Sequence, residues 1–317
     1  MWPFPSFAAA ALALAVERFT GYPQALQTAI GHPVQWIGKL ICWLDDTFND
    51  PFLDADASRL MGAAALALLL LACLTPAWIV AALLAQVRYG WVIEAALATA
   101  FIAQHSLRGH VAAVASGLTR SLEDGRTAVA RIVGRDPQTL DESDVSRAAL
   151  ESLAENTADG IVAPVLWYAL LGLPGLALYK AINTADSMIG HHSERYSNFG
   201  WAVARLDDLV NLPASRLTGL LLAIAAGPRW RAALGAMWHD AGKHRSPNAG
   251  WPEAAMAGAL GLRFGGPRNY QGETVDLPWL GAGREDLTRD DIIAGLNLYG
   301  RAITLFLIFA VLAALVL

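Results

Sequence analysis

The strongest constraint on this chain is a stretch of 28 residues without a charged side chain, residues 60–87. A helix needs about 20 mainly apolar residues to cross the hydrocarbon core of a bilayer. Thr75 and Pro76 interrupt the stretch, but a kink is tolerated where neighbouring helices or the threonine hydroxyl satisfy the released carbonyl. The sequence therefore predicts a membrane-spanning helix here.

The composition agrees with a membrane protein. Hydrophobic residues make up 55% of the chain and charged residues 16%, whereas about a quarter of the residues of a soluble protein are charged. The 23 Lys and Arg against 28 Asp and Glu give a formal charge of −5, and no basic stripe is present, so we expect no nucleic-acid partner. Cys42 and Cys73 lie far apart in apolar surroundings, and we expect both to be core residues.

We expect an all-α, polytopic integral membrane protein with about four spans. Those spans are predicted near residues 4–16, 60–87, 91–107 and 302–317. Glu94 lies inside the third of them. The chain is expected to form a single membrane-embedded catalytic domain, residues 1–317, with its polar catalytic segments within 108–301.

Two further apolar segments are expected to be re-entrant or buried helices. Residues 161–179 are broken by Gly172, Pro174 and Gly175, and residues 209–227 contain Pro213 and Arg216. Breaks of this kind leave apolar arms too short to cross a bilayer.

The distribution of cations predicts the topology. In the four-span arrangement, segments 17–59 and 108–301 share one side and hold every Lys and Arg except Arg88. Cytoplasmic segments carry the excess of Lys and Arg. We therefore expect a multi-pass protein of the inner membrane with its active face in the cytoplasm.

A stripe of charge lies next to one of the apolar arms. Arg147, Glu151, Glu155 and Asp159 follow one another at intervals of four residues, which places them on one face of a helix. An isolated stripe is usually a solvated face with ion pairs. This one runs directly into an apolar segment, where stacked carboxylates are costly unless a cation or substrate uses them.

Oxygen-rich side chains recur further along the chain. Lys180, Asn183 and Ser187 share a helical face with Asp186 beside them, and Asp207 and Asn211 are four residues apart. Carboxylate and amide oxygens suit Mg²⁺, which usually takes one or two protein carboxylates and completes its octahedron with phosphate and water.

Residues 239–253 combine cations with glycines, prolines and polar donors. That composition is typical of a loop that binds phosphate, and the alternative is a basic loop touching anionic lipid headgroups. No P-loop motif is present. A zinc site built from the histidines is disfavoured, because carboxylates outnumber them and cysteine ligands are missing.

Five motifs, taken together and in order, resemble the CbiB/CobD family of cobalamin biosynthesis, the adenosylcobinamide-phosphate synthases. They lie at residues 151–160, 180–188, 194–201, 204–208 and 246–253. The resemblance extends from about His32 to Trp279. At Gly21, Tyr22 and Pro23 the chain departs from the family's Gly-Asp-Pro, so no site role is carried onto that segment.

The resemblance implies an integral membrane enzyme that joins a propionate carboxylate of adenosylcobyric acid to (R)-1-aminopropan-2-ol or its phosphate. The amide bond would be formed at the expense of ATP with Mg²⁺. The implied partners are the corrinoid, the aminoalcohol and membrane lipid, with other cobalamin-pathway enzymes as possible associates. A carboxylate is a poor acyl donor, so an acyl phosphate is the expected activated form, and cations and metal would stabilise the transferring phosphoryl group.

Individual roles are assigned by residue type. The catalytic candidates are Glu151 and Glu155, either of which could deprotonate the attacking ammonium, and Lys180. The candidates for substrate or phosphate binding are Arg135, Asn156, Asn183, Arg195, Arg205, Lys243, His244, Arg245, Ser246 and Asn248. The metal-ligand candidates are Asp159, Asp186, Asp207 and Asp208.

Two other classes remain open on the residues alone. Prenyl-diphosphate transferases hold magnesium diphosphate between acidic motifs on membrane helices, and two motifs would serve here: Asn183 with Asp186, and Asp207 and Asp208 with Asn211. A non-enzymatic transporter also buries polar residues along its path, although the paired broken helices of two related halves are only weakly indicated here.

Overall fold

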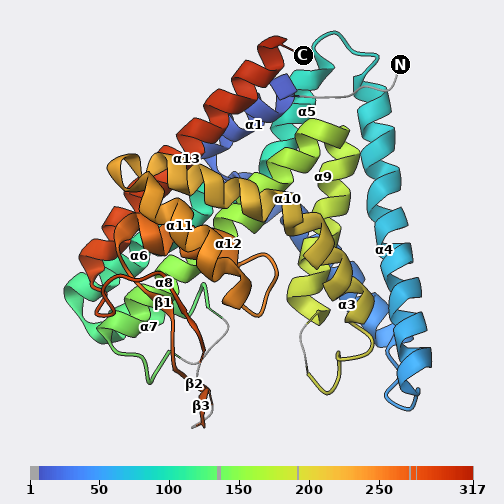
Figure 1. Cartoon of the computed structure of the whole chain (residues 1–317). Coiled ribbons are helices and arrows are strands. Elements are labelled where there is room, and N and C mark those ends of the chain that lie inside the picture. Colours follow the sequence, from blue (N-terminus) through green and yellow to red (C-terminus); the bar gives the residue numbers. More distant parts are fainter. Residues whose placement is uncertain (1–6, 134–136, 191–192, 271–272, 276, 317) are drawn as a thin grey trace. The chain divides into compact units, whose positions relative to one another are not determined.

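The computed structural model describes residues 7–133, 137–190, 193–270, 273–275 and 277–316. Most of these residues form helices (Figure 1), which confirms the all-α class. Arg135, a predicted phosphate ligand, lies outside the described residues.

The chain divides into two compact units, each built from separate stretches of sequence. Unit 1 comprises Met1–Ala103, Ala163–Asn211 and Ala310–Leu317, and unit 2 comprises Gln104–Val162 and Leu212–Phe309. The single catalytic domain expected from the sequence stays a prediction.

Unit 1 is built around α9, against which α1, α3, α4 and α5 pack. The elements that begin in this unit are α1 (Phe7–Thr20), α2 (Gln24–Ile30), α3 (Pro33–Phe48), α4 (Ala55–Leu84), α5 (Gly90–Ala98), a 3-10 turn (Thr99–Phe101), α9 (Ala163–Ile189) and α10 (Trp201–Ala225). Ile41 of α3, Leu69 of α4 and Ala185 of α9 meet in one apolar core. Burial of such side chains contributes about 1.5–3 kcal/mol for each large aliphatic one.

Unit 2 is built around α8, which packs against α6, α7 and α12. Its elements are α6 (Gln104–Arg120), α7 (Leu122–Val129), α8 (Glu142–Thr157), a π-helical turn (Ala158–Val162), a 3-10 turn (Gly227–Arg229), α11 (Trp230–Asp240), a second 3-10 turn (Ala241–Lys243), α12 (Gly250–Leu260), β1 (Phe264–Gly265), β2 (Arg268–Tyr270), β3 (Glu273–Val275), β4 (Trp279–Leu280) and α13 (Arg289–Val316), with α13 continuing into unit 1 from Ala310. Strand β1 pairs antiparallel with β4, and β2 with β3. Helices α11 and α12 approach closely at Gly258, where a Cβ atom would lie 2.6 Å from the carbonyl oxygen of Ala232.

Four helical runs in the described chain are long and apolar enough to cross a membrane: Ala55–Leu84, Glu142–Ile189, Trp201–Ala225 and Arg289–Val316. This number agrees with the sequence prediction, and the first and last runs contain most of residues 60–87 and 302–317. The other two differ from the expected spans. Helix α1 has only 14 residues, and the predicted helix 91–107 is interrupted between the end of the 3-10 turn at Phe101 and the start of α6 at Gln104. Which segments cross the bilayer stays a prediction.

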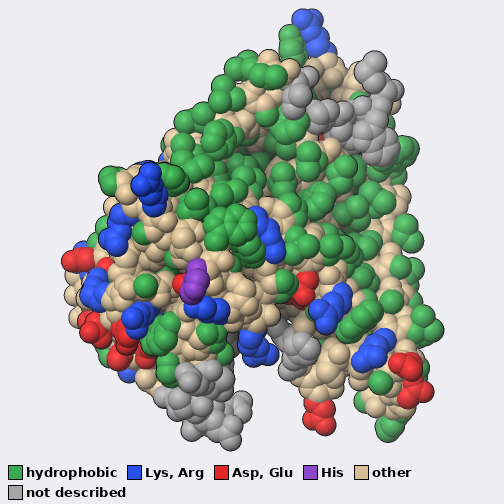
Figure 2. Space-filling view, in the orientation of Figure 1, with side chains coloured by type: hydrophobic (Ala, Val, Ile, Leu, Met, Phe, Trp, Pro, Cys, Tyr) green, Lys and Arg blue, Asp and Glu red, His purple; other side chains and the backbone are tan. Residues whose placement is uncertain are grey.

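The four runs differ in how much protein surrounds them. Only 28% of the apolar window of α4 is buried, whereas 72% of that in Glu142–Ile189 is buried. Figure 2 shows hydrophobic side chains along α4, with charged ones gathered at its lower end. Helix α4 therefore has the surface of a lipid-facing helix, and the run through α9 is enclosed by protein, as the buried-helix alternative for residues 161–179 expected.

The predicted break in residues 161–179 is confirmed. Gly172 has φ 64° and ψ −159° inside α9, a conformation that glycine adopts without the steric penalty of a side chain. Pro174 follows in the first turn of the second arm. The backbone N–H of Leu173, released by the break, donates to Oε1 of Glu94 at 3.1 Å, and both groups are buried. Glu94, which lies inside the predicted span 91–107, therefore supports the break in α9.

We expect Glu94→Leu to lower the stability of unit 1, because the buried Leu173 N–H would lose its acceptor at a cost of about 1–3 kcal/mol. Glu94→Gln retains an acceptor oxygen and should lose much less. The measurement is the thermal midpoint in detergent. Equal midpoints for the two variants would show that the hydrogen bond to Leu173 contributes nothing.

Candidate functional site

Asp207 on α10 is one of the buried acidic groups of unit 1. Its Oδ2 accepts a hydrogen bond from Nδ2 of Asn211 at 2.9 Å, and Oδ1 of Asn211 accepts from the Tyr179 hydroxyl at 2.9 Å. The exposed fractions of Asp207 and Asn211 are 9% and 1%. Asp207 and Asn211 lie side by side, as their spacing predicts, but the amide oxygen of Asn211, which was expected to face a metal together with the carboxylate, accepts from Tyr179 instead. The hydrogen bonds from Tyr179 through Asn211 fix the orientation of the Asp207 carboxylate.

The second oxygen of Asp207 has a different environment. Oδ1 is buried and makes no hydrogen bond to any described residue. The negative charge of Asp186 on α9 acts on the same carboxylate, and Asn183 lies beside it. Two carboxylates brought together in an apolar bundle repel each other and lose solvation, so the arrangement fits a site for a cation.

The remaining predicted metal ligands are placed differently. Asp208 is partly exposed and lies 3.9 Å from the exposed Arg205, and Asp159 belongs to the π-helical turn of unit 2. Among the described residues, no three His, Cys, Asp or Glu side chains are grouped closely enough to hold a metal ion by themselves. A Mg²⁺ ion at Asp186 and Asp207 would therefore take its other ligands from phosphate and water.

Lys180 places a positive charge on α9, the helix that also carries Asp186. Its exposed fraction is 8%, and its Nζ donates to Oδ1 of Asn183 at 3.3 Å. The predicted face of Lys180 and Asn183 is thus present. Asp186, six residues after Lys180 on α9, carries the negative charge that acts on Asp207.

Arg195 has a carboxylate partner that sequence reasoning missed. Its Nη2 lies 2.6 Å from Oδ2 of Asp45, which also accepts from the Tyr196 hydroxyl at 3.1 Å. The hydrogen bond and the charge of Asp45 raise the pKa of Arg195, and burial followed by the hydrogen bond to Asp45 raises that of Tyr196. Asp45 lies four residues after the buried Ile41 on the apolar stripe of α3, and that position was the available signal.

The residues of the predicted acidic stripe on α8 differ in their burial in unit 2. Glu151 is buried, and its Oε1 accepts the backbone N–H of Gly265 in β1 at 2.7 Å. Glu155 is exposed. Asn156 donates to the carbonyl oxygen of Ser152 at 2.9 Å. Arg147 bonds Asp144 at 2.7 Å and the carbonyl oxygen of Glu285 at 2.8 Å.

Asp240 organises the predicted phosphate loop, although sequence reasoning gave it no role. Its Oδ1 lies 2.6 Å from Nζ of Lys243 and 2.7 Å from Nδ1 of His239, and its Oδ2 accepts the N–H of Gly281 at 2.8 Å. Burial acts to raise the pKa of Asp240, but these hydrogen bonds outweigh it and hold the pKa below its ordinary value. The three-residue spacing to Lys243 was the available signal.

The other predicted phosphate ligands of this loop also have protein contacts, with one exception. Ser246 Oγ accepts the N–H groups of Asn248 and Ala249, and Asn248 Oδ1 accepts from Ser215 and Arg216. His244 Nδ1 accepts the N–H of Ser246 at 3.0 Å. Arg245 is exposed and has no partner in the part of the chain that the structure describes.

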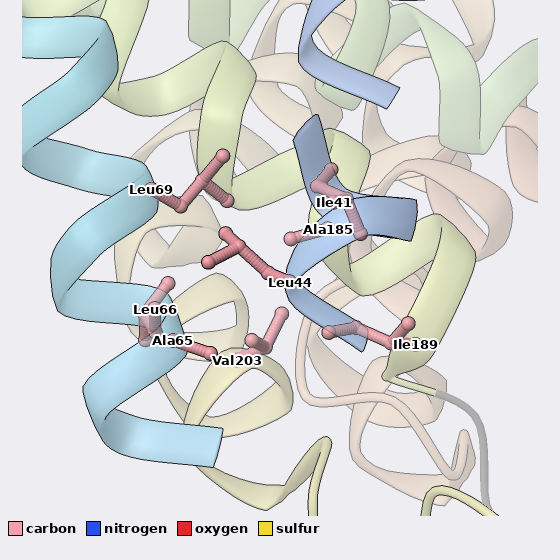
Figure 3. A pocket seen from close by; sticks show the side chains of 8 residues that line it. All are labelled: Ile41, Leu44, Ala65, Leu66, Leu69, Ala185, Ile189 and Val203. Atoms are coloured by element: carbon pink, nitrogen blue, oxygen red, sulfur yellow. The ribbon is translucent and has the colours of Figure 1, made fainter. Parts of the chain in front are cut away.

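An apolar hollow in unit 1 is not a substrate site. Ile41, Leu44, Leu66 and Leu69 are among the side chains that line it (Figure 3). Its volume is about 10 Å³, roughly the space of one water molecule. It is a packing defect of the core that joins α3, α4, α9 and α10.

These features define a class of protein: a polytopic all-α membrane protein with buried carboxylates inside its helices. The sequence profile described as "CobD/Cbib protein" matches residues 10–299. The chain belongs to the CobD/CbiB family.

Several curated relatives are similar over nearly the whole chain, each named "Cobalamin biosynthesis protein CobD". The relative from Sinorhizobium fredii is 50% identical over 92% of each chain, and that from Rhodobacter capsulatus is 50% identical over 92% of each. A relative from Brucella suis is 47% identical over 96% of each. No solved structure matches the chain.

We expect Asp240→Asn to destabilise unit 2, because the variant loses the negative charge and one of the two acceptor oxygens, so that Lys243 and Gly281 cannot both keep their partner. The cost is about 1.5–3 kcal/mol for hydrogen bonds to a charged group. Lys243→Gln leaves Gly281 bonded and should cost less. The measurement is the thermal midpoint in detergent.

The stabilities of wild type and Asp240→Asn can also be compared as a function of pH. Because the pKa of Asp240 is lowered in the folded protein, its stabilisation is present above the ordinary value of 3.8 and is lost as the pH falls through the folded value. The difference between wild type and Asp240→Asn should therefore shrink on acidification. A difference that grows would contradict this assignment.

Proposed function

We propose that this protein acts in cobalamin biosynthesis as an ATP-dependent amide ligase. It would join (R)-1-aminopropan-2-ol or its phosphate to the propionate carboxylate of adenosylcobyric acid, which makes it an adenosylcobinamide-phosphate synthase. Family membership supports the pathway. The observation that carries the chemistry is the buried Asp207, oriented by Asn211 and facing the charge of Asp186.

The reaction has two balanced steps. The propionate oxygen attacks the terminal phosphorus of ATP and releases ADP, and the amine then attacks the acyl carbon and expels phosphate. Asp186 and Asp207 would hold Mg²⁺, which neutralises phosphate charge when bound. Tyr179 and Asn211 keep Asp207 in place, and Lys180 would bind a phosphate oxygen.

The base that deprotonates the ammonium is assigned to Glu155 rather than Glu151. A general base needs access to the substrate proton. Glu155 is exposed, whereas Glu151 is buried and holds the N–H of Gly265. Glu151 is therefore better suited to fixing β1 against α8.

The structure weakens the prenyl-diphosphate alternative. That interpretation used Asn211 as part of a second metal-binding motif, but the Asn211 oxygen accepts from Tyr179 and its amide donates to Asp207. Its polar atoms are therefore engaged in orienting Asp207. The transporter alternative has no specific observation in its favour.

We expect purified protein to consume ATP only when both the corrinoid carboxylate and the aminoalcohol are present. Asp207→Asn keeps the shape of the side chain but removes its charge, so kcat should fall by about 100-fold or more, as when a main transition-state contact is lost. Asp208→Asn, on the partly exposed neighbour, should have a much smaller effect.

The thermal midpoint of each variant establishes that it is folded. Wild-type activity of Asp207→Asn at ordinary magnesium would remove this residue from the site. Turnover without ATP would contradict the ligase and favour a transferase.

The protein is proposed to lie in the inner membrane with its polar segments in the cytoplasm, where ATP is available. A background without Cys42 and Cys73 allows Ser197→Cys and Gly242→Cys to be labelled separately. Both positions are exposed, and a Cβ atom at Gly242 meets nothing within 4 Å. An impermeant reagent should leave both unlabelled in intact cells and label them after lysis; labelling of either from outside would contradict this orientation.

A further inference from the structure

His32 is the N-cap residue of α3 in unit 1, and its imidazole ring is held in a defined orientation. Its Nδ1 accepts the backbone N–H of Val34 at 3.2 Å, while Gln35 Oε1 accepts the N–H of His32 at 3.0 Å. This reciprocal pair is a capping box. Because Nδ1 is the acceptor, the neutral ring carries its proton on Nε2, which is therefore a hydrogen-bond donor.

The imidazole is held by an aromatic neighbour as well as by the cap. The Tyr22 ring meets it edge to face with centroids 4.4 Å apart. The Tyr22 hydroxyl donates to the carbonyl oxygen of Gly31 at 2.9 Å. The direction of the Nε2–H bond is thus fixed before any ligand arrives, which lowers the entropic cost of using it.

The neighbouring charge is that of Lys180. Burial, followed by the charge of Lys180, lowers the pKa of His32, so the ring is neutral near pH 7. Helices α3 and α9 are held together by the core that contains Ile37, Ile41, Ala181 and Ala185. This packing places His32, which precedes α3, and Lys180 of α9 on two helices in contact.

An ammonium group and an imidazole N–H are both donors and cannot satisfy each other. A cation and a fixed neutral donor on two helices that pack against each other match an oxyanion, which accepts from both. We propose that His32 and Lys180 are the two protein arms of an oxyanion-binding site that takes a phosphate or carboxylate oxygen of a substrate. Which substrate supplies that oxygen rests on the proposed function, whereas the binding itself does not.

The position of the site on α9 is compatible with a bound phosphate chain. Lys180 precedes Asp186 by six residues, which corresponds to roughly 9 Å along a helix. A ligand that reached both residues would have an oxyanion at Lys180 and His32 and another oxygen near Asp186 and Asp207, the residues that would hold Mg²⁺. His32 thus becomes a binding residue of the proposed reaction that its sequence motif did not reveal.

Two substitutions separate binding from capping. His32→Asn keeps an acceptor for Val34, because asparagine is among the best N-cap residues, but it removes the distal N–H. Gln35→Ala removes the other half of the capping box and leaves the imidazole in place. If His32 binds an oxyanion, the asparagine variant should keep its thermal midpoint and lose affinity, and the Gln35 variant should do the reverse.

The binding arm uses inorganic phosphate and the full-length protein in neutral detergent. Phosphate that binds the folded state raises the thermal midpoint by mass action. Wild type and Gln35→Ala should respond at similar phosphate concentrations, whereas His32→Asn should need about tenfold more, as expected for a lost hydrogen bond to a charged group. In a Lys180→Gln background the His32 substitution should have less effect, because the two residues bind one ion.

The kinetic arm identifies the source of the oxyanion. The Michaelis constants for ATP, the aminoalcohol with and without phosphate, and the corrinoid carboxylate are measured one at a time. For His32→Asn we expect one of them to rise about tenfold, and that substrate carries the bound oxygen. The Gln35→Ala variant should leave all of them near wild type.

The outcomes distinguish this inference from the proposed function. If the wild-type protein makes no amide but is stabilised by phosphate through His32, the proposed ligase activity is contradicted and the oxyanion-binding site is retained. Wild type that is not stabilised by phosphate, or His32→Asn with an unchanged phosphate response and unchanged Michaelis constants, would show that His32 is a helix cap only.

Discussion

A carboxylate inside an apolar helix bundle must find hydrogen-bond donors, because an isolated buried charge is strongly unfavourable. This constraint organises both units. Glu94 takes the N–H that the break in α9 releases at Leu173, and Glu151 takes that of Gly265 in β1. Asp240 holds Gly281. In each case the acid joins segments that are distant in sequence, so the acidic residues connect the helices while the apolar surfaces supply most of the free energy.

Local features could be predicted from the sequence because they depend on neighbours in the chain. The charge-free stretch became most of α4, the glycines and proline of residues 172–175 became the break in α9, and the four-residue spacing brought Asn211 to Asp207. The resemblance to the family was confirmed over nearly the whole chain. These inferences required only helical periodicity, the conformational range of glycine and proline, and the recognition of motifs.

Three other features were not predicted, and only the first of them depends on which helices meet. Arg195 was assigned to phosphate without its partner, because Asp45 lies 150 residues earlier in the chain. Lys243 was also assigned to phosphate without its protein partner. That partner, Asp240, is only three residues earlier in the chain, and it also accepts the N–H of Gly281, which follows β4. The helix expected at 91–107 ends early because α5 passes into a 3-10 turn, and neither glycine nor proline marks that point. The composition of residues 91–107 alone is suited to one continuous helix.

The buried acids fall into two kinds when each oxygen is considered separately. Asp45 accepts from Asn49 on one oxygen and from Arg195 and Tyr196 on the other, and Asp240 likewise uses both oxygens on protein donors. An acid with both oxygens occupied has a structural role that is complete without a ligand. Asp207 differs, because one oxygen is fixed by Asn211 while the other has no hydrogen bond within the described chain and lies in the field of Asp186. That combination costs stability in the protein alone and is compensated when a cation binds, which is why Asp207 is the residue on which the proposed chemistry depends.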